Sequence, residues 1–193
     1  RQPARVAEAS PALVWIEAPS NPLLRLTDIA AVADAAHAAG ALVAADNTFC
    51  SPILQRPLDL GADVVVHSTT KYINGHSDVV GGAVVARTPE LAEEASWWAN
   101  SLGLTGSAMD AYLTLRGLRT LELRMRRHQE NAQAIADAVA GHPGLAALHY
   151  PGLADHPDHE LCRRQQAGPG AMLALEVIGG ASGVRAFLAG LGF

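Results

Sequence analysis

The sequence has 193 residues, of which 49% are hydrophobic, and a formal net charge of −5 at pH 7. This length allows one sizeable core, or one domain and part of another. The mildly acidic charge excludes an obvious nucleic-acid-binding surface, and no apolar run is long enough to span a bilayer. Cys50 and Cys162 lie far apart and nothing indicates export, so we expect reduced thiols in a cytoplasmic protein.

Both ends of the sequence look cut. The chain opens on "RQPARVAEASPALVWIEAP", which has no initial methionine and resembles the tail of a helix or loop entering a strand. It stops at "VRAFLAGLGF", inside an amphipathic pattern that has no stop signal. We therefore expect a fragment of a longer protein.

Short apolar runs alternate with helical patterns along most of the chain. Strands are predicted at residues 12–17, 41–46, 63–68, 81–86 and 171–177. Helices are predicted at 27–40, from 88 onward, over most of 107–141 with an interruption at Gly117, and from about Ser182, with a short irregular crossover at 51–62. The first helix has Thr27 as its expected N-cap and Gly40 as its stop. This alternation predicts a mainly parallel α/β sheet with helices on both faces.

The pattern changes near the long helical stretch. A Pro- and Asp-rich turn follows it, and then a new strand begins. We expect residues 1–128 to form part of a large α/β domain. Residues 129–193 would form a linking helix and the start of a smaller C-terminal α/β domain.

Polar side chains follow three of the predicted strands at the point where each strand ends. Asn21 follows the first strand, Asp46 ends the second, and Ser68 ends the third, with Thr70 and Lys71 directly after it. Ligands of open parallel sheets bind outside the carboxyl ends of the strands. We therefore expect Asn21, Asp46 and Lys71 to face one crevice.

A lysine, a carboxylate and paired hydroxyls together suit pyridoxal phosphate (PLP). Its aldehyde reacts with a lysine amine, and its ring nitrogen needs an anion to stay protonated. Asp46 would supply that anion, because opposite charges at close range favour both ionised forms. The hydroxyls of Ser68 and Thr70, with nearby backbone amides, suit the phosphate.

Four separated blocks carry a resemblance to a known family. The blocks "EAPSNP", "ADNTF", "HSTTKYINGHSDVVGG" and "RRQQAGPGAMLALE" resemble, in this order, the Cys/Met-metabolism family of PLP-dependent enzymes. The likeness covers nearly the whole chain. It implies the PLP-dependent transferase fold (aspartate-aminotransferase-like, fold type I).

The resemblance also implies a role for each candidate residue. Lys71 matches the Schiff-base lysine, Asp46 the partner of the ring nitrogen, and Ser68 and Thr70 the phosphate ligands. Asn21 matches a residue near the substrate carboxylate. The family also uses an upstream phosphate loop and stacking aromatic ring, a downstream arginine and contacts from a neighbouring subunit. Since these parts are missing here, we expect the chain alone to be inactive.

Within the family, the block "WWANSLGLTG" is most similar to the bacterial enzymes that synthesise cystathionine. That similarity implies a γ-replacement that joins an O-acylhomoserine, expected to be O-succinylhomoserine, to L-cysteine in methionine biosynthesis. A cystathionine γ- or β-lyase or an O-acylhomoserine sulfhydrylase is the alternative, and an inactive remnant of such an enzyme is the alternative of another class. The resemblance further implies a homotetramer built from dimers.

Each candidate residue also has a simpler interpretation. Lys71 could be a solvated loop lysine, and Asp46 could be a turn or capping residue. Ser68 and Thr70 could cap the turn, and Asn21 lies in an ordinary turn sequence. The order of the four blocks favours the functional interpretation.

Three histidines and a nearby aspartate need no catalytic role. His76 and Asp78 are expected in a structural, hydrogen-bonded loop. His156 and His159 have a spacing close to that of metal ligands, but they lie in a turn without convergent partners. No metal site is predicted.

Overall fold

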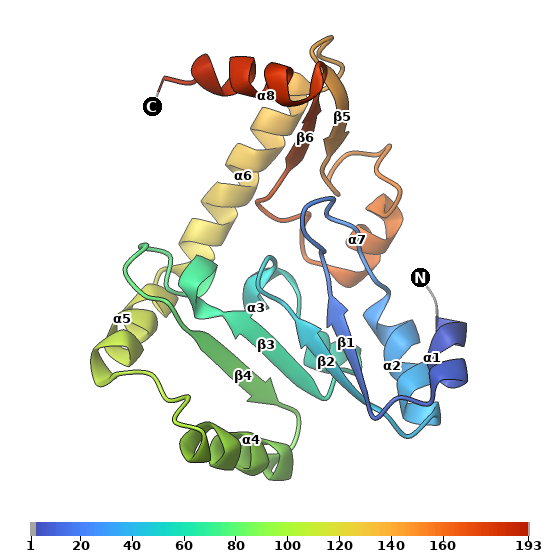
Figure 1. Ribbon diagram of the computed structural model, residues 1–193, viewed down its shortest axis with the longest axis vertical. Helices are drawn as coiled ribbons and strands as arrows, with labels where there is room; N and C mark the ends of the chain where they lie inside the picture. Colours follow the sequence, from blue (N-terminus) through green and yellow to red (C-terminus); the bar gives the residue numbers. More distant parts are fainter. Residues whose placement is uncertain (1–2, 193) are drawn as a thin grey trace.

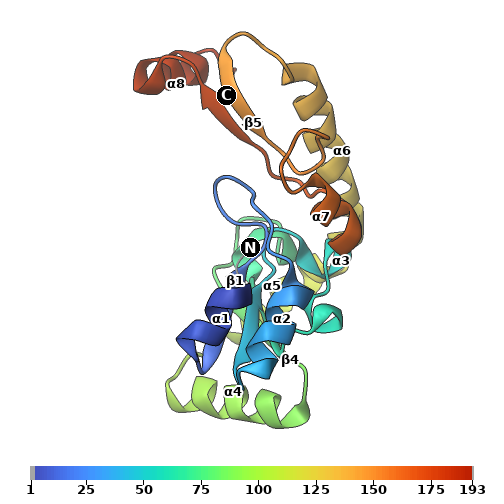
Figure 2. The same cartoon turned by 90° about the vertical axis from the view of Figure 1, so that its right-hand side faces the viewer.

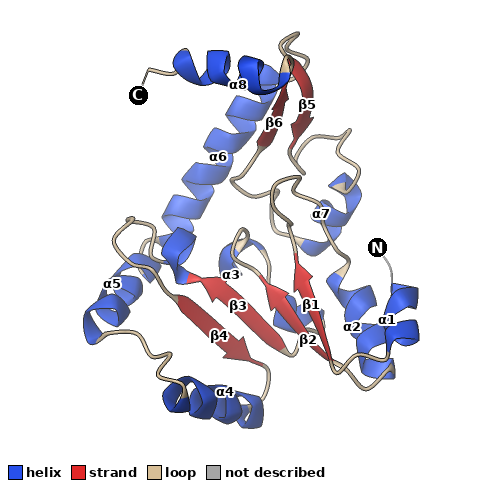
Figure 3. Ribbon diagram, viewed as in Figure 1, coloured by secondary structure: helices blue, strands red, loops and turns tan. Residues whose placement is uncertain are grey.

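The computed structural model describes residues 3–192, which contain six strands and eight α-helices (Figures 1 and 3). The strands are β1 (Leu13–Glu17), β2 (Leu42–Asp46), β3 (Val64–Ser68), β4 (Gly82–Ala86), β5 (Leu145–His149) and β6 (Ala174–Val177). The α-helices are α1 (Pro3–Ala9), α2 (Ile29–Ala38), α3 (Ser51–Leu54), α4 (Pro89–Ser101), α5 (Ala108–Leu118), α6 (Leu121–Val139), α7 (His159–Gln165) and α8 (Gly180–Ala189). A 3-10 turn, η1 (Pro57–Leu60), and a π-helical turn, η2 (Thr69–Ile73), complete the set. Within residues 3–192, no helix combines the length and hydropathy that a membrane crossing needs.

The first four strands form one sheet in the order β1-β2-β3-β4. β1, β2 and β3 are parallel, with Glu17 beside Asp46 and Asp46 beside Val66, whereas β4 runs antiparallel to β3. The predicted mainly parallel sheet is confirmed. The carboxyl ends of its three parallel strands therefore lie at one edge.

The chain has a second, smaller sheet in which β5 and β6 pair antiparallel. Figure 2 shows α6 rising from the region of the large sheet to the small sheet, with α7 between them. α6 runs from Leu121 to Val139 without a break, so the expected boundary at residue 128 falls inside a helix. That boundary remains a prediction.

Helix α2 covers one face of the large sheet. Its buried residues Ile29, Val32 and Ala36 join a core with Ile16 and Val43. The opposite face carries the alternate residues of each strand, and Trp15 on that face is 58% exposed. Helix α2 thus packs tightly over β1 and β2, whereas apolar side chains such as Trp15 stay open on the other face.

Of the two predicted ends of α2, the C-terminal one was right and the N-terminal one was wrong by one residue. Asp28, not Thr27, is the N-cap, because the helix begins at Ile29 and the Asp28 carboxylate accepts a hydrogen bond from the Ala31 amide at 3.1 Å. Gly40 ends the helix as expected, with a φ of +74° that suits glycine.

Strand β5, helix α7 and the π-helical turn η2 were not predicted, and one break was placed two residues early. Strand β5 is only partly buried and pairs with β6 from about 30 residues downstream, a partner that local patterning does not reveal. Helix α7 has seven residues and is held by tertiary contacts: the Gln165 side chain accepts a hydrogen bond from the Ile29 amide at 3.0 Å. The long helical stretch breaks between Leu118 and Leu121 rather than at Gly117.

The backbone of residues 73 and 74 passes so close to Gly117 that a side chain there would clash. An alanine there gains up to about 1 kcal/mol of helix propensity. However, its Cβ would lie 2.2 Å from the Asn74 carbonyl oxygen and 2.6 Å from that of Ile73. Since both are backbone atoms next to η2, we expect Gly117→Ala to lower the free energy of unfolding of the whole protein by about 1–3 kcal/mol.

Urea unfolding measures this change, and Gly106→Ala is the matched control. A Cβ at Gly106 would meet nothing within 4 Å, so the control should change the stability by less than about 0.5 kcal/mol. Equal stability of the two variants would contradict the predicted clash.

Candidate active site

Lys71 lies in the π-helical turn that directly follows β3. Its φ of −92° and ψ of −119° are not helical, so the turn is kinked at the lysine. Two backbone hydrogen bonds close the turn: the Asn74 amide donates to the Thr69 carbonyl at 3.0 Å, and the Gly75 amide donates to the Lys71 carbonyl at 2.8 Å. The backbone of Lys71 is therefore held while its side chain remains exposed.

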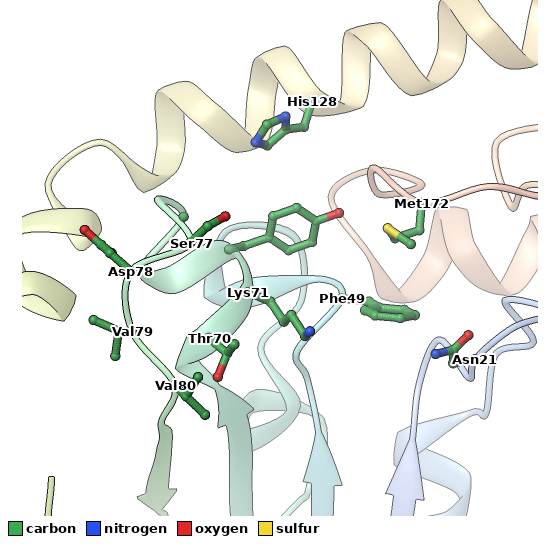
Figure 4. A pocket seen from close by; sticks show the side chains of 12 residues that line it. Asn21, Phe49, Thr70, Lys71, Ser77, Asp78, Val79, Val80, His128 and Met172 are labelled. Carbon is green, nitrogen blue, oxygen red and sulfur yellow. The ribbon is translucent and has the colours of Figure 1, made fainter. Parts of the chain in front are cut away.

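A cavity of about 860 Å³ lies beyond the carboxyl ends of the parallel strands, and Lys71 lines it. In Figure 4 the Lys71 amine points towards the ring of Phe49, and Asn21 lies beyond that ring. The lining residues are Asn21, Phe49, Thr70, Lys71, Tyr72, Gly75, Ser77, Asp78, Val79, Val80, His128 and Met172. Of the three residues expected to face one crevice, Asn21 and Lys71 line this cavity, with Thr70 beside them, whereas Asp46 does not line it.

Asp46 and Ser68 are not among the residues that line this cavity. The register places both on the same face of the sheet, because Asp46 pairs with Val66 and Ser68 is two residues further along β3. Thr48 connects them: its amide donates to Asp46 Oδ1 at 2.9 Å, and its hydroxyl accepts from the Ser68 amide at 2.9 Å. One residue therefore fixes the ends of both strands.

The Thr70 hydroxyl has a structural role at the mouth of the turn. It accepts a hydrogen bond from the Gly81 amide at 3.0 Å and lies 3.3 Å from the Gly81 carbonyl, to which it donates. These contacts tie the lysine turn to the start of β4. Thr70 thus has a structural contact outside the turn, beside its place on the cavity wall.

The loop after the lysine turn is hydrogen-bonded, as predicted. The Asn74 side chain donates to Asp78 Oδ1 at 2.7 Å, and His76 Nδ1 lies 2.7 Å from the Asn74 carbonyl. Asn74 itself is fully buried. The loop therefore has a structural explanation, although Asp78 also reaches the cavity.

The cavity residues that were not assigned roles from the sequence include Phe49, Tyr72, His128 and Met172. Tyr72 and His128 are in ring contact, with centroids 5.7 Å apart, and burial raises the pKa of Tyr72. Phe49 could have been found, since it stands three residues after the strand end at Asp46. His128 and Met172 come from α6 and from the segment before β6, and no local pattern points to them.

His67 faces the other side of β3 from Ser68. It lines a second cavity of about 360 Å³ together with residues such as Thr69, Ile73 and Leu118. The side chain is buried, and its Nδ1 has no hydrogen-bond partner in the part of the chain that the structure describes. Burial lowers the pKa of His67, and the nearby Asp46 carboxylate partly offsets this effect.

Comparisons with known proteins agree with this arrangement. The chain is 53% identical to the cystathionine gamma-synthase of Escherichia coli (strain K12) over 181 residues, which are 94% of this chain and 47% of that enzyme. It is 51% identical to the cystathionine gamma-lyase of Dictyostelium discoideum over 176 residues, which are 91% of this chain and 46% of that enzyme. The crystal structure of cystathionine gamma synthase from Xanthomonas oryzae pv. oryzae in complex with aminoacrylate and cysteine matches with a TM-score of 0.96 and 61% identity, covering 99% of this chain and 49% of that one.

The fold and the cavity define an α/β protein of the PLP-dependent transferase type, with its reactive lysine candidate beyond a parallel strand. Residues 2–192 match the family model described as Cys/Met metabolism PLP-dependent enzyme. The chain belongs to this family. It spans about half the length of the curated relatives it matches.

The donor set of the site fits the cofactor of this family. Lys71 is the only lysine in the sequence and therefore its only primary side-chain amine. The Asp46 carboxylate and the Ser68 hydroxyl belong to the same face and the same edge of the sheet, and Thr70 adds a second hydroxyl on the cavity wall. An amine, an anion and hydroxyl donors are the groups that the aldehyde, ring nitrogen and phosphate of PLP require.

The environment of His67 predicts a pH dependence of stability. Its pKa is lowered in the folded state, so below about pH 6.5 the unfolded chain takes up a proton that the folded chain does not. The free energy of unfolding should therefore fall as the pH falls from 7 to 5, by at most about 1.4 kcal/mol per pH unit for this histidine.

We expect His67→Gln to flatten this decrease and the exposed-site control His142→Gln to leave it unchanged. Urea unfolding of the whole protein at several pH values measures both effects. The same slope in His67→Gln and in the unsubstituted protein would show that His67 is not the titrating group.

Proposed function

We propose that the whole protein catalyses a PLP-dependent γ-replacement. It would join an O-acylhomoserine, with O-succinylhomoserine as the expected substrate, to L-cysteine and release cystathionine and the free acid. The observation that carries this proposal is the position of the only lysine, Lys71, on the wall of the cavity beyond β3. The similarity to synthases, at 61% identity over 99% of the chain in one solved structure, supports the reaction type.

Four residues of this chain would hold the cofactor. Lys71 would bind its aldehyde carbon, and Asp46 would keep the proton on its ring nitrogen. The Ser68 hydroxyl would donate to its phosphate, and so would the Thr70 hydroxyl after its hydrogen turns away from the Gly81 carbonyl. When bound, PLP supplies an electron sink for negative charge on the carbon next to the substrate amino group. A carboxylate suits the ring nitrogen because opposite charges at close range stabilise both ionised groups.

Lys71 would have a second role once the substrate amine has replaced it. Its amine would move protons at the α- and β-carbons of the substrate, a task that requires a base within hydrogen-bonding reach. The kink at Lys71 and the two backbone hydrogen bonds around it support this role, because they fix the start of the side chain. Asn21, across the cavity from Lys71, would bind the substrate carboxylate.

A lyase is the second candidate, and the 51% identity to the Dictyostelium discoideum γ-lyase favours it. The two reactions differ in what happens at the γ-carbon. In the replacement, the bond from this carbon to the leaving group breaks and a bond to the cysteine sulfur forms, so the site must hold a second amino acid and exclude water. A lyase has only to release its first product. We further propose that the whole protein is a cytoplasmic homotetramer, because its sequence resembles a family for which we expect that assembly.

Reductive trapping tests the role of Lys71. We expect borohydride reduction of the whole protein loaded with PLP to place the pyridoxyl group on Lys71. Lys71→Ala should lose this label and almost all turnover, because the chain then has no other primary side-chain amine near the cavity. Peptide mapping that found the label on a different lysine of the whole protein would overturn the assignment.

A competition assay tests the reaction type. The whole protein is given O-succinylhomoserine and L-cysteine at near-physiological concentration, and cystathionine is measured against α-ketobutyrate. We expect cystathionine to predominate. Predominant α-ketobutyrate, or efficient cleavage of cystathionine, would identify a lyase, and strong activity with sulfide but little with cysteine would identify a sulfhydrylase.

A further inference from the structure

The side chain of Arg124 reaches from α6 to the lysine turn. Its Nη1 donates to the Tyr72 carbonyl at 2.7 Å, and its Nη2 lies 3.4 Å from the Ile73 carbonyl. Tyr72 and Ile73 are the two residues that directly follow Lys71. One guanidinium from a distant helix therefore binds the backbone on the C-terminal side of the lysine.

The same guanidinium also binds the break between α5 and α6. Its Nη2 donates to the Gly117 carbonyl at 2.8 Å, and its Nε donates to the Thr120 hydroxyl at 3.0 Å. The planar fork of arginine can make such contacts together, whereas a lysine ammonium is a single point on a flexible stem. Arg124 thus joins the lysine turn to α5 and α6 at one point.

The hydrogen bonds that close the lysine turn do not use the carbonyls of its last two residues. The closing bonds described above use the carbonyls of Thr69 and Lys71, and Arg124 binds those of Tyr72 and Ile73. Gly75 allows the approach, since a Cβ there would lie 2.0 Å from Arg124 Nη1. The turn is therefore built around the guanidinium.

Neighbouring arginines on α6 make different contacts. Arg126 pairs with Glu122 at 2.9 Å and Arg127 with Glu130 at 3.3 Å, all of them exposed on the helix surface. Arg124 is half-buried, and burial lowers its pKa, but a guanidinium starts so high that it stays charged at neutral pH. His128, one turn further along α6, contacts the ring of Tyr72, so the same face of the helix meets the turn twice.

We propose that Arg124 is a positioning residue, which fixes the orientation of Lys71 by binding the two carbonyls that follow it. This inference rests on the proposed function, because it assumes that Lys71 binds the cofactor. Arg124 would touch neither cofactor nor substrate. Its effect would reach the reaction through the backbone of the lysine turn.

The test follows the attachment of PLP to Lys71 in the whole protein over time. Apoprotein is mixed with PLP, samples are reduced with borohydride at intervals, and the Lys71 peptide is quantified by mass spectrometry. Total bound PLP, urea stability, kcat and KM are measured beside it. The variants are Arg124→Gln and Arg124→Lys, and Arg126→Gln is the matched control from the surface of the same helix.

We expect Arg124→Gln to bind PLP but to attach it to Lys71 about tenfold or more slowly, since misplacing a reacting group by about 1 Å can cost roughly a hundredfold. Its kcat should fall by a similar factor, with KM changed less than about twofold. Arg124→Lys should recover part of the rate, because an ammonium can still donate to one carbonyl. Arg126→Gln should match the unsubstituted protein in every measurement.

Attachment at the normal rate in folded Arg124→Gln, with only its stability lowered, would overturn the positioning role. The same conclusion follows if neither Arg124 variant folds, because Arg124 would then act on the fold as a whole. An unsubstituted protein that attaches no PLP to Lys71 would instead overturn the proposed function, and the positioning role with it. The two failures are thus distinguished by the unsubstituted protein.

Discussion

The parallel pairing of β1, β2 and β3 is the constraint on which the site depends. Parallel strands cannot be joined by tight turns, so α2 and the α3–η1 segment must carry the chain back across the sheet. Each parallel strand therefore ends at the same edge of the sheet, and the residues that follow it lie at that edge. Because the register sets Asp46 beside Val66, a carboxylate on β2 and a hydroxyl on β3 share a face.

The backbone that leaves this edge has amides and carbonyls that the sheet no longer pairs, and nearby side chains satisfy them. Thr48 accepts from the Ser68 amide, Asp46 accepts from Thr48, and Thr70 pairs with Gly81. The residues proposed to hold the cofactor are thus already used to shape the strand ends. This double use explains why the simpler interpretations of Asp46 and Thr70 are physically sound and still compatible with a site. The Ser68 side chain, by contrast, makes no capping hydrogen bond to the turn.

The sequence was most informative where the physical signal is local. The strand ending at Asp46 and the helix ending at Gly40 follow from apolar patterning and from the conformation that glycine permits. Strand β5 and helix α7 depend on partners far along the chain, which no window of sequence contains. The same difference explains which site residues could be predicted. Lys71 follows a strand in a local pattern that the sequence shows, whereas His128 reaches the cavity only through the path of α6.

The part of the chain around β5 and β6 is connected to the large sheet on two sides of the cavity. On one side, α6 contacts the lysine turn through Arg124 and His128. On the other side, Asp158 at the start of α7 binds Arg25, which follows β1, at 2.7 Å, and Gln165 of α7 binds the side chain of Gln55, at the end of α3, at 2.9 Å. Gln55 is almost fully buried, so breaking the second connection would leave polar groups unpaired away from water, which is costly. The hydrogen bonds of the first connection are half-exposed, but the buried Leu121 and Met125 of α6 also pack against Ile73 of the lysine turn. Both connections therefore resist movement between the two parts, and the α6 connection does so at the turn that carries Lys71.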